Sequence, residues 1–199
     1  MTRPKRIQAV FLNIPYDQQF ERLCLAYIVG LTQLGLKINA TLAVPNQGLL
    51  TRILNLVEES DFSIHDLSRT ELSRGIPRFN MSLELGLARC RSDSNPECHR
   101  VFVFEKKACR TLKSTSDINS IDAQIHNGTV KGVMGKLRYI FHQPDGTMVP
   151  EMLSSCRGVR QRLPEPRRNA GSESLFEASI FNDFTVAALE RERIINGRH

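Results

Sequence analysis

Glu84 carries the strongest chemical signal in this sequence. It lies within 81–88, a helical pattern that is apolar around much of its girth, and an ionisable group on such a buried helix needs a physical reason. With Asn80 as the expected cap, Glu84 falls near the first turn, where the helix dipole favours the ionised form. A fixed carboxylate facing a cleft suits attack on, or stabilisation of, an oxocarbenium-like sugar carbon. Acidic residues near helix starts also stabilise helices without further function, so both interpretations stay open.

Asp66 is a second acidic candidate, placed just past a buried strand. A carboxylate there is well placed to bind a ribose hydroxyl or to hold a base. It is equally suited to capping the following loop by accepting hydrogen bonds from backbone amides. His65, one position earlier, points to the opposite side of the strand, and we interpret it as a packed histidine.

Polar residues in three further segments complete the candidate site. The loop after the first strand, the loop after the third strand and the polar stretch 113–122 are each expected near one edge of the sheet. Arg78 and Lys113 suit a phosphate group, although each is also ordinary as a surface charge. The candidate substrate-binding residues are Asn13, Tyr16, Ser68, Arg78, Asn80, Lys113, Asp117 and Asn119.

The elements that must position these residues alternate between strand and helix. Nearly continuous apolar runs predict buried strands, and apolar residues at helical spacing predict the helices between them. The predicted strands are 7–14, 36–44, 61–67 and 100–104, and the predicted helices are 17–34, 50–57, 81–91 and 129–142. This alternation predicts an α/β domain with a flavodoxin-like three-layer fold, whose parallel sheet of four or five strands has the order 2-1-3-4. Ligands of such sheets bind beyond the carboxyl ends of the strands.

The remaining chain divides into two parts. Residues 143–172 are rich in Pro, Gly, Arg and Ser, and we predict an irregular basic linker with its charge concentrated in 157–168. Residues 173–199 return to a helical pattern with an apolar face, predicted to pack back on the α/β domain of residues 1–142. A partner-binding helix is the alternative for this last segment.

Composition narrows the class of protein. No apolar run approaches the roughly 20 residues that a membrane helix needs, and the basic N-terminus precedes no signal-peptide pattern, so we expect no membrane partner. Five scattered cysteines predict reduced thiols, hence a cytoplasmic protein, and no metal site. The net charge of +6 favours anionic partners, but no nucleic-acid recognition motif occurs, so we expect no nucleic acid partner. Without GxGxxG or a P-loop, we do not expect a dinucleotide dehydrogenase or a P-loop NTPase.

Several separated segments together resemble a family of uncharacterised bacterial proteins. These are Phe11–Asp17, Ser63–Arg69, Pro77–Gly86, Ser116–Asp122 and Phe181–Phe184. That family is similar to nucleoside 2-deoxyribosyltransferases and TIR-like domains, which share an Asp after the third strand and an E-x-G, here Glu84-Leu85-Gly86. The resemblance implies that Glu84 is the catalytic carboxylate at an N-glycosidic bond and that Asp66 positions the substrate. The DG-rich loop that deoxyribosyltransferases carry before this Glu is Arg78-Phe79-Asn80 here, which leaves hydrolysis and simple binding open.

The leading hypothesis is an N-glycosidase that cleaves a nucleotide or NAD, with no bound cofactor. The resemblance implies a role in defence or signalling, and a homo-oligomer, because relatives often complete their sites across a subunit interface. The alternative is a non-catalytic nucleotide-binding sensor or effector module that releases its nucleotide or nucleoside ligand unchanged. A third hypothesis is an interaction protein that uses the basic segment and the last helix.

Overall fold

A parallel sheet of five strands forms the centre of the molecule. The computed structural model describes residues 7–43, 48–69, 79–108, 122–141, 148–161, 176 and 178–196. The strands are β1 (Ala9–Asn13), β2 (Lys37–Asn39), β3 (Phe62–Asp66), β4 (Arg100–Glu105) and β5 (Gln124–Ile125). Their order is β2-β1-β3-β4-β5, with every neighbouring pair parallel. This confirms the predicted flavodoxin-like α/β fold and its 2-1-3-4 order, to which β5 adds the fifth strand.

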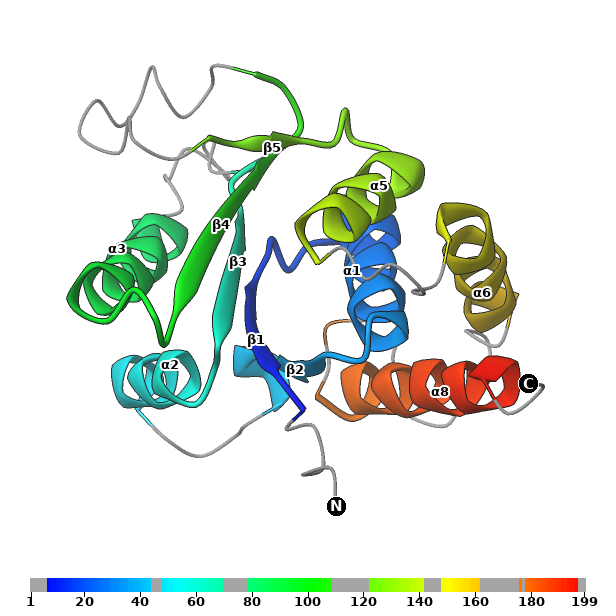
Figure 1. Ribbon diagram of the computed structural model, residues 1–199, viewed down its shortest axis with the longest axis horizontal. Helices are drawn as coiled ribbons and strands as arrows, with labels where there is room; N and C mark the ends of the chain where they lie inside the picture. The colour runs from blue at the N-terminus through cyan, green and yellow to red at the C-terminus, as the bar shows by residue number, and fades with distance from the viewer. Residues whose placement is uncertain are drawn as a thin grey trace.

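Helices cover both faces of the sheet, giving three layers (Figure 1). Helices α1 (Glu21–Gln33) and α5 (Val130–Ile140) lie on one face. Helices α2 (Leu49–Glu58) and α3 (Phe79–Ser94) lie on the other. The crossovers of parallel strands place helices on both faces, which explains why the strands read as continuous apolar runs.

The side chains of β1 show how the two faces are filled. Val10 and Leu12 are fully buried in the large core under α1 and α5, whereas Phe11 packs on the other face with Ile53 of α2. Successive side chains of a strand point to opposite faces. The same alternation decides below which polar side chains can meet at the end of β3.

Helix α1 is enclosed by other helices rather than exposed on the surface. It packs against α5, α6 (Val149–Gln161) and α8 (Ala178–Asn196), and Figure 1 shows α6 and α8 as a further layer outside it. A Cβ at Gly30 of α1 would lie 2.7 Å from Leu137 Cδ1 of α5, so glycine allows this close helix contact. The buried apolar face of α8, which includes Phe181 and Phe184, makes this C-terminal helix part of the core.

Helix α6 corrects the prediction that residues 143–172 are irregular. Met152, Ser155, Cys156 and Val159 recur at helical spacing and are buried against α1 and α5. The many Arg and Ser residues between them masked this apolar stripe in the sequence. Arg157 and Arg160 therefore lie on a helix and not in a linker, and residues 162–172 are outside the described part of the chain.

Two predicted boundaries also differ from the structure. The sequence predicts a second strand over 36–44, but β2 ends at Asn39 and a short 3-10 helix, η2 (Thr41–Ala43), packs under α8. Helix α3 begins at Phe79, so Asn80 lies inside its first turn and is not its cap. Strand β2 lies at the edge of the sheet with one neighbour, and beyond it η2 brings Leu42 against the core.

No helix among the described residues is long and apolar enough to span a bilayer. The four cysteines in the described part of the chain, Cys24, Cys90, Cys98 and Cys156, are free thiols.

Candidate functional site

The carboxyl ends of the central strands meet at one edge of the sheet and carry polar side chains. Asn13 ends β1 opposite His65 of β3, and Asp66 ends β3 opposite Phe104 of β4. Because the strand alternates, His65 faces α2 and α3 while Asp66 faces α1 and α5. Phe11, which packs on α2, makes an edge contact with the His65 ring at 5.9 Å between centroids. Asp66 instead bonds to Tyr27 of α1.

The polar edge is therefore divided into two clusters. The Glu84 cluster comprises Asn13, Arg52, His65 and Glu84 on the side of α2 and α3, together with Tyr16, which packs against the core on the side of α1 and interacts electrostatically with Glu84. The Asp66 cluster, on the side of α1 and α5, comprises Tyr27, Asp66, Ser68 and His126. Of these nine residues, the sequence had singled out Glu84, Asp66, Asn13, Tyr16 and Ser68 as site residues.

Glu84 is buried without a hydrogen-bond partner among the described residues. It lies in the second turn of α3 and its side chain is only 5% exposed. None of the hydrogen bonds or ion pairs of the described residues includes its carboxyl group. Burial raises the pKa of Glu84 to about 7, and the Arg52 guanidinium on α2 offsets part of that rise. The carboxyl group therefore changes charge near neutral pH.

Arg52 acts on the charge of Glu84, and the charge of Glu84 acts on Tyr16. Burial raises the pKa of the Tyr16 hydroxyl far above its ordinary value, the Glu84 carboxylate raises it further and Arg52 lowers it. These mutual effects show that the three groups lie within electrostatic reach of one another. The Tyr16 hydroxyl lies 3.2 Å from Thr41 Oγ1 and 3.5 Å from the Leu12 carbonyl oxygen, so it stays protonated and held in place.

Asn13 fixes the helix that carries Glu84. Its side-chain amide donates to the Met81 carbonyl oxygen in the first turn of α3 at 3.3 Å, and to His65 Nδ1 at 2.9 Å. His65 Nδ1 must therefore be the unprotonated nitrogen. Burial and the nearby His99 lower the pKa of His65 to about 3, so the ring stays neutral. Asn13 is 4% exposed and its donors are used internally, so it positions α3 rather than contacting a ligand through its amide hydrogens.

Asp66 is completely enclosed by internal donors. It has no exposed surface. Its Oδ2 accepts from the Tyr27 hydroxyl at 2.8 Å, and its Oδ1 accepts from the Ser68 backbone amide at 2.9 Å. His126 Nε2 lies 3.2 Å from the same Oδ2. Burial and the Asp66 charge raise the pKa of Tyr27 well above its usual range. The bond to the Ser68 amide is the loop-capping arrangement that was the alternative to ligand binding.

The Asp66 cluster contains Ser, His and Asp but lacks the geometry of a catalytic triad. The Gly128 backbone amide donates to His126 Nδ1 at 3.1 Å, so the proton of the neutral ring is on Nε2. That same Nε2 faces both Asp66 Oδ2 and Ser68 Oγ, the latter at 3.0 Å. A serine is activated by an unprotonated nitrogen whose partner nitrogen bonds the acid. The cluster is therefore a structural clamp at the end of β3.

The sequence did not single out His126 or Tyr27. Tyr27 belongs to the apolar face of α1 by its spacing, and its hydroxyl bonds a residue 39 positions away. His126 follows the two-residue strand β5 and precedes the tight turn Asn127-Gly128, in which both residues have positive φ. The Thr129 cap of α5 just after this turn is the local signal that marks the region.

Among the described residues, Asn80 is the one predicted site residue that lies in neither cluster. Asn80 is exposed on the surface of α3. The remaining predictions, Arg78, Lys113, Asp117 and Asn119, fall outside the described residues. Glu84 and Asp66 lie at the same edge of the sheet but on opposite faces, so they do not form a pair of opposed carboxylates.

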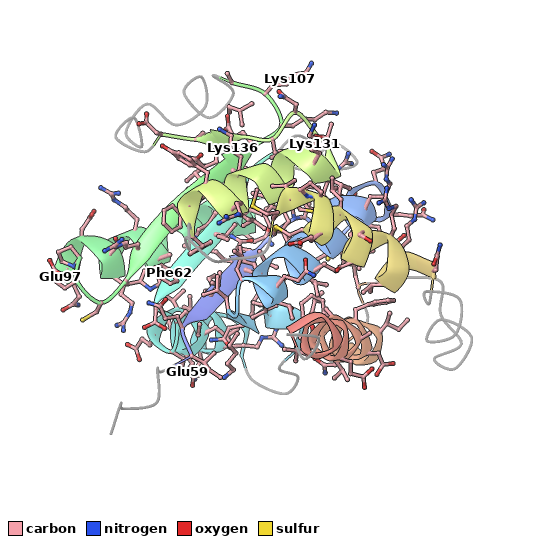
Figure 2. The ribbon with its side chains drawn as sticks, turned by 45° about the vertical axis from the view of Figure 1, so that its right-hand side comes forward. Glu59, Phe62, Glu97, Lys107, Lys131 and Lys136 are labelled. Atoms are coloured by element: carbon pink, nitrogen blue, oxygen red, sulfur yellow. The ribbon has the colours of Figure 1, made fainter. Side chains whose placement is uncertain are left out.

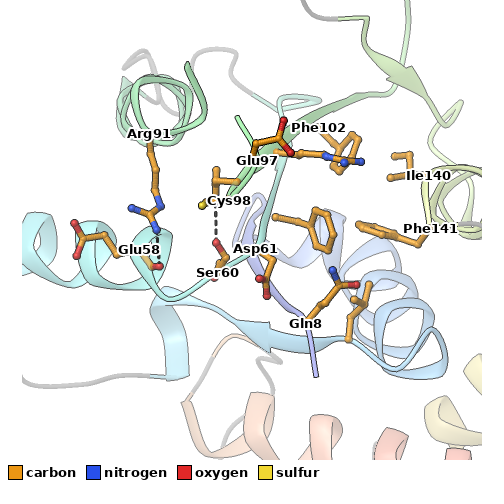
Figure 3. A pocket seen from close by; sticks show the side chains of 14 residues that line it. Gln8, Glu58, Ser60, Asp61, Arg91, Glu97, Cys98, Phe102, Ile140 and Phe141 are labelled. Carbon is orange, nitrogen blue, oxygen red and sulfur yellow. Dashed lines mark hydrogen bonds between the residues drawn. The ribbon is translucent and has the colours of Figure 1, made fainter. Parts of the chain in front are cut away.

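A cavity of about 670 Å³ lies at the opposite, amino-terminal edge of the sheet (Figure 3). Its aromatic wall includes Phe62, Phe102 and Phe141. Its buried His99 bonds the Ser60 carbonyl oxygen through Nδ1 and Ser63 Oγ through Nε2, each at 2.8 Å. Burial lowers the pKa of His99. Both ring nitrogens of His99 are therefore committed, and the cavity lies at the edge opposite to the carboxyl ends of the strands, where ligands of this fold bind.

Comparisons with known proteins do not add a family. Neither the scan against protein-family models nor the search of curated proteins finds a match to this chain. Within the described residues, no group of three or more His, Cys, Asp or Glu side chains is arranged to hold a metal ion.

Proposed function

We propose that this protein is an N-glycosidase that cleaves a nucleotide or NAD, with Glu84 as its catalytic carboxylate. One observation carries the proposal: a buried carboxyl group, without a hydrogen bond to any described residue, lies at the carboxyl edge of a parallel sheet, where ligands of this fold bind. Desolvating an ionisable group without pairing it destabilises the fold. A strongly shifted pKa in such a place is a recognised sign of function.

Glu84 acts on the sugar carbon in the proposed reaction. The bond between C1′ and the base nitrogen breaks, and its electron pair leaves with the base. The ionised Glu84 stabilises or captures the resulting ribosyl cation. A water molecule then forms the new C–O bond at C1′, which displaces the Glu84 carboxylate where it has bonded to C1′, and releases its extra proton to Glu84 or to solvent. A poorly solvated carboxylate serves this role well because few hydrogen bonds must be broken as positive charge develops.

The enclosure of Asp66 favours NAD as the substrate. Most purine and pyrimidine bases leave efficiently only when a second acidic group protonates them. Asp66 was the second acid predicted from the sequence, and it is committed to Tyr27, Ser68 and His126. The pyridinium base of NAD departs as a neutral molecule and needs no proton. Of the two predicted acids, Glu84 is the one without a hydrogen-bond partner among the described residues, and a leaving group that needs no proton fits a site with one such acid best.

Chromatography of released bases tests the proposal. The purified protein is incubated with NAD and with a panel of nucleosides and nucleotides, and free base is quantified. We expect nicotinamide release by the wild type and its loss in Glu84→Gln. The matched control is Arg160→Ala, which alters a residue near the end of α6 and is expected to retain the wild-type rate. Equal release by wild type and Glu84→Gln would disprove a catalytic role for Glu84.

A non-catalytic nucleotide-binding module is the second candidate. The observation that favours it is again the enclosure of Asp66, which leaves Glu84 as the one carboxyl group of the two clusters without partners among the described residues. Calorimetric binding of NAD or a nucleotide, with no base released over long incubation, would support this candidate over the glycosidase.

A further inference from the structure

A second cavity lies at the carboxyl edge of the sheet, on the side of α1 and α5. Its volume is about 230 Å³. Ser68 and Arg69 line it from the loop after β3, Lys106 from the end of β4, Arg22 from α1 and Gly128 from the turn before α5. The cavity therefore adjoins the Asp66 cluster, at the same edge of the sheet as Glu84.

The charged side chains that line this cavity are all cationic. Arg22, Arg69 and Lys106 line it, and its described lining includes no acidic residue. The Arg69 guanidinium donates to Asp17 Oδ2 at 2.7 Å and to Gln19 Oε1 at 2.6 Å, which holds it in one orientation. Arg69 remains 38% exposed, so this ion pair does not withdraw it from the cavity.

Two helices begin beside the cavity. Helix α5 starts at Val130, which lines the cavity, and α1 starts at Glu21, next to the lining residue Arg22. The amino end of a helix carries partial positive charge, which adds to the field of the three cationic side chains. Figure 2 shows Lys107 and Lys131 at this same edge, whereas Glu59 and Glu97 lie toward the opposite edge.

Glycine at position 128 leaves room for the Lys106 side chain. Gly128 has a φ of +65°, and a Cβ there would lie 2.9 Å from Lys106 Cε and 3.2 Å from its Cγ. The aliphatic stem of Lys106 thus lies across this turn, and the positive φ of Gly128 favours glycine there. Behind the turn, the Gly128 amide and the His126 ring fix Ser68 against Asp66. The cavity wall is therefore constrained by hydrogen bonds before any ligand arrives.

We infer that this cavity binds a phosphate or diphosphate group through Arg22, Arg69 and Lys106. Guanidinium groups match the geometry of phosphate oxygens, and an ammonium group adds a compact charge. The inference deepens the proposed function and rests on it in one respect: a substrate that reaches across the sheet edge from this cavity to Glu84, on the side of α2 and α3, is a phosphorylated nucleotide rather than a free nucleoside.

Isothermal titration calorimetry with inorganic pyrophosphate tests the cavity directly at fixed ionic strength. We expect binding by the wild type, and about tenfold weaker binding by Arg22→Gln and by Lys106→Met. Lys106→Met keeps most of the aliphatic stem beside Gly128 and removes the charge. The control is Lys107→Met, which removes the same charge from the next residue. The Lys107 side chain does not line the cavity. Thermal unfolding verifies that each variant is folded.

Three results would overturn the inference. They are no pyrophosphate binding by the wild type, equal weakening by Lys107→Met, and equal affinity in all variants. AMP and adenosine form a second pair of probes that separates nucleotide phosphate from free phosphate. We expect AMP to bind more tightly than adenosine by a factor that Lys106→Met removes.

The activity assay separates failure of this inference from failure of the proposed function. In one outcome, Glu84→Gln binds pyrophosphate as the wild type does, and the wild type releases no base. That outcome would support the phosphate site and disprove the glycosidase. Base release from nucleosides and nucleotides with equal kcat/KM would leave the glycosidase standing and remove the phosphate site.

Discussion

Glu84 and Asp66 are both buried acids at the carboxyl edge of one sheet, and they differ in what surrounds them. Asp66 accepts hydrogen bonds from a tyrosine hydroxyl and a backbone amide and faces a histidine N–H. Glu84 accepts none from the described residues. Burial alone therefore does not distinguish a structural acid from a candidate catalytic one. The number of internal hydrogen-bond donors distinguishes the two, because a buried acid with donors stabilises the fold and a buried acid without them destabilises it.

The largest expected effect is on the pH dependence of catalysis. If Glu84 must be ionised, kcat/KM follows its pKa of about 7 in the free enzyme. We expect a plateau above pH 8 and a fall of about 100-fold between pH 8 and pH 5. Base release measured across this range checks it. A flat profile would show that the two acids do not differ in the way proposed.

The next effect is on the pH dependence of the free energy of unfolding. An acid with internal donors stabilises the fold as pH rises, whereas an acid without them destabilises it. Glutamate has an ordinary pKa of 4.5, whereas the pKa of Glu84 in the folded protein is about 7, so the folded state binds more protons between these values. Stability is therefore lost as pH rises from 4.5 to 7, by about 3 kcal/mol. We expect Glu84→Gln to match the wild type near pH 4.5 and to exceed it by about that amount above pH 7.

Urea unfolding of the wild type and Glu84→Gln at about pH 5 and about pH 8 measures this difference. A variant that is less stable than the wild type at both pH values would mean that Glu84 has internal donors after all. Glu84 and Asp66 would then not differ in whether internal donors stabilise them.

Asp66→Asn should have the opposite effect and destabilise the fold. The amide keeps one acceptor oxygen but places an NH₂ group among donors, so at least one of the Ser68 amide, Tyr27 hydroxyl and His126 Nε2–H loses its acceptor. We expect a loss of about 2 kcal/mol in the free energy of unfolding. Tyr27→Phe, which removes a single donor, should cost about 1 kcal/mol. Equal stability of Asp66→Asn and wild type would show that the cluster is not a clamp.

A pair of glycine substitutions sharpens the same comparison through the turn that holds His126. A Cβ at Gly132 of α5 would lie 2.0 Å from the His126 carbonyl oxygen, so Gly132→Ala must displace the turn at a cost of about 1–3 kcal/mol. Gly135 lies on the same helix with nothing within 4 Å of the corresponding Cβ. Gly135→Ala should therefore stabilise the helix by up to about 1 kcal/mol. Chemical denaturation of both variants decides whether the turn is as tightly packed as the geometry indicates.

The sheet was largely predictable because its strands carry their own signal. The apolar runs around Phe11 and Val103 identified buried parallel strands, and the strand order followed from the alternation with helices. Helix α6 was missed because four buried side chains are spread among polar and basic ones. The start of α3 was misplaced because Asn80 is a good cap by type, whereas the structure starts the helix at Phe79.

The sequence predicted several residues of the candidate site but not how they are arranged. Glu84 was chosen because a charge on an apolar helix is unusual, and the structure buries it as that pattern indicated. The role of Asp66 had two open interpretations in the sequence. One donor, the Ser68 backbone amide, is local, but Tyr27 and His126 lie 39 and 60 residues away along the chain, so no local pattern showed that Asp66 is fully enclosed.

The sequence by itself determined the layered fold, the edge at which polar side chains gather, and the alternation that sends His65 and Asp66 to opposite faces. Only the tertiary structure decided which buried acid is supplied with hydrogen-bond donors from the described residues and which is not. The physical reason is that strand and helix periodicity is set by neighbouring residues. Desolvation and hydrogen bonding are set by groups brought together from distant parts of the chain.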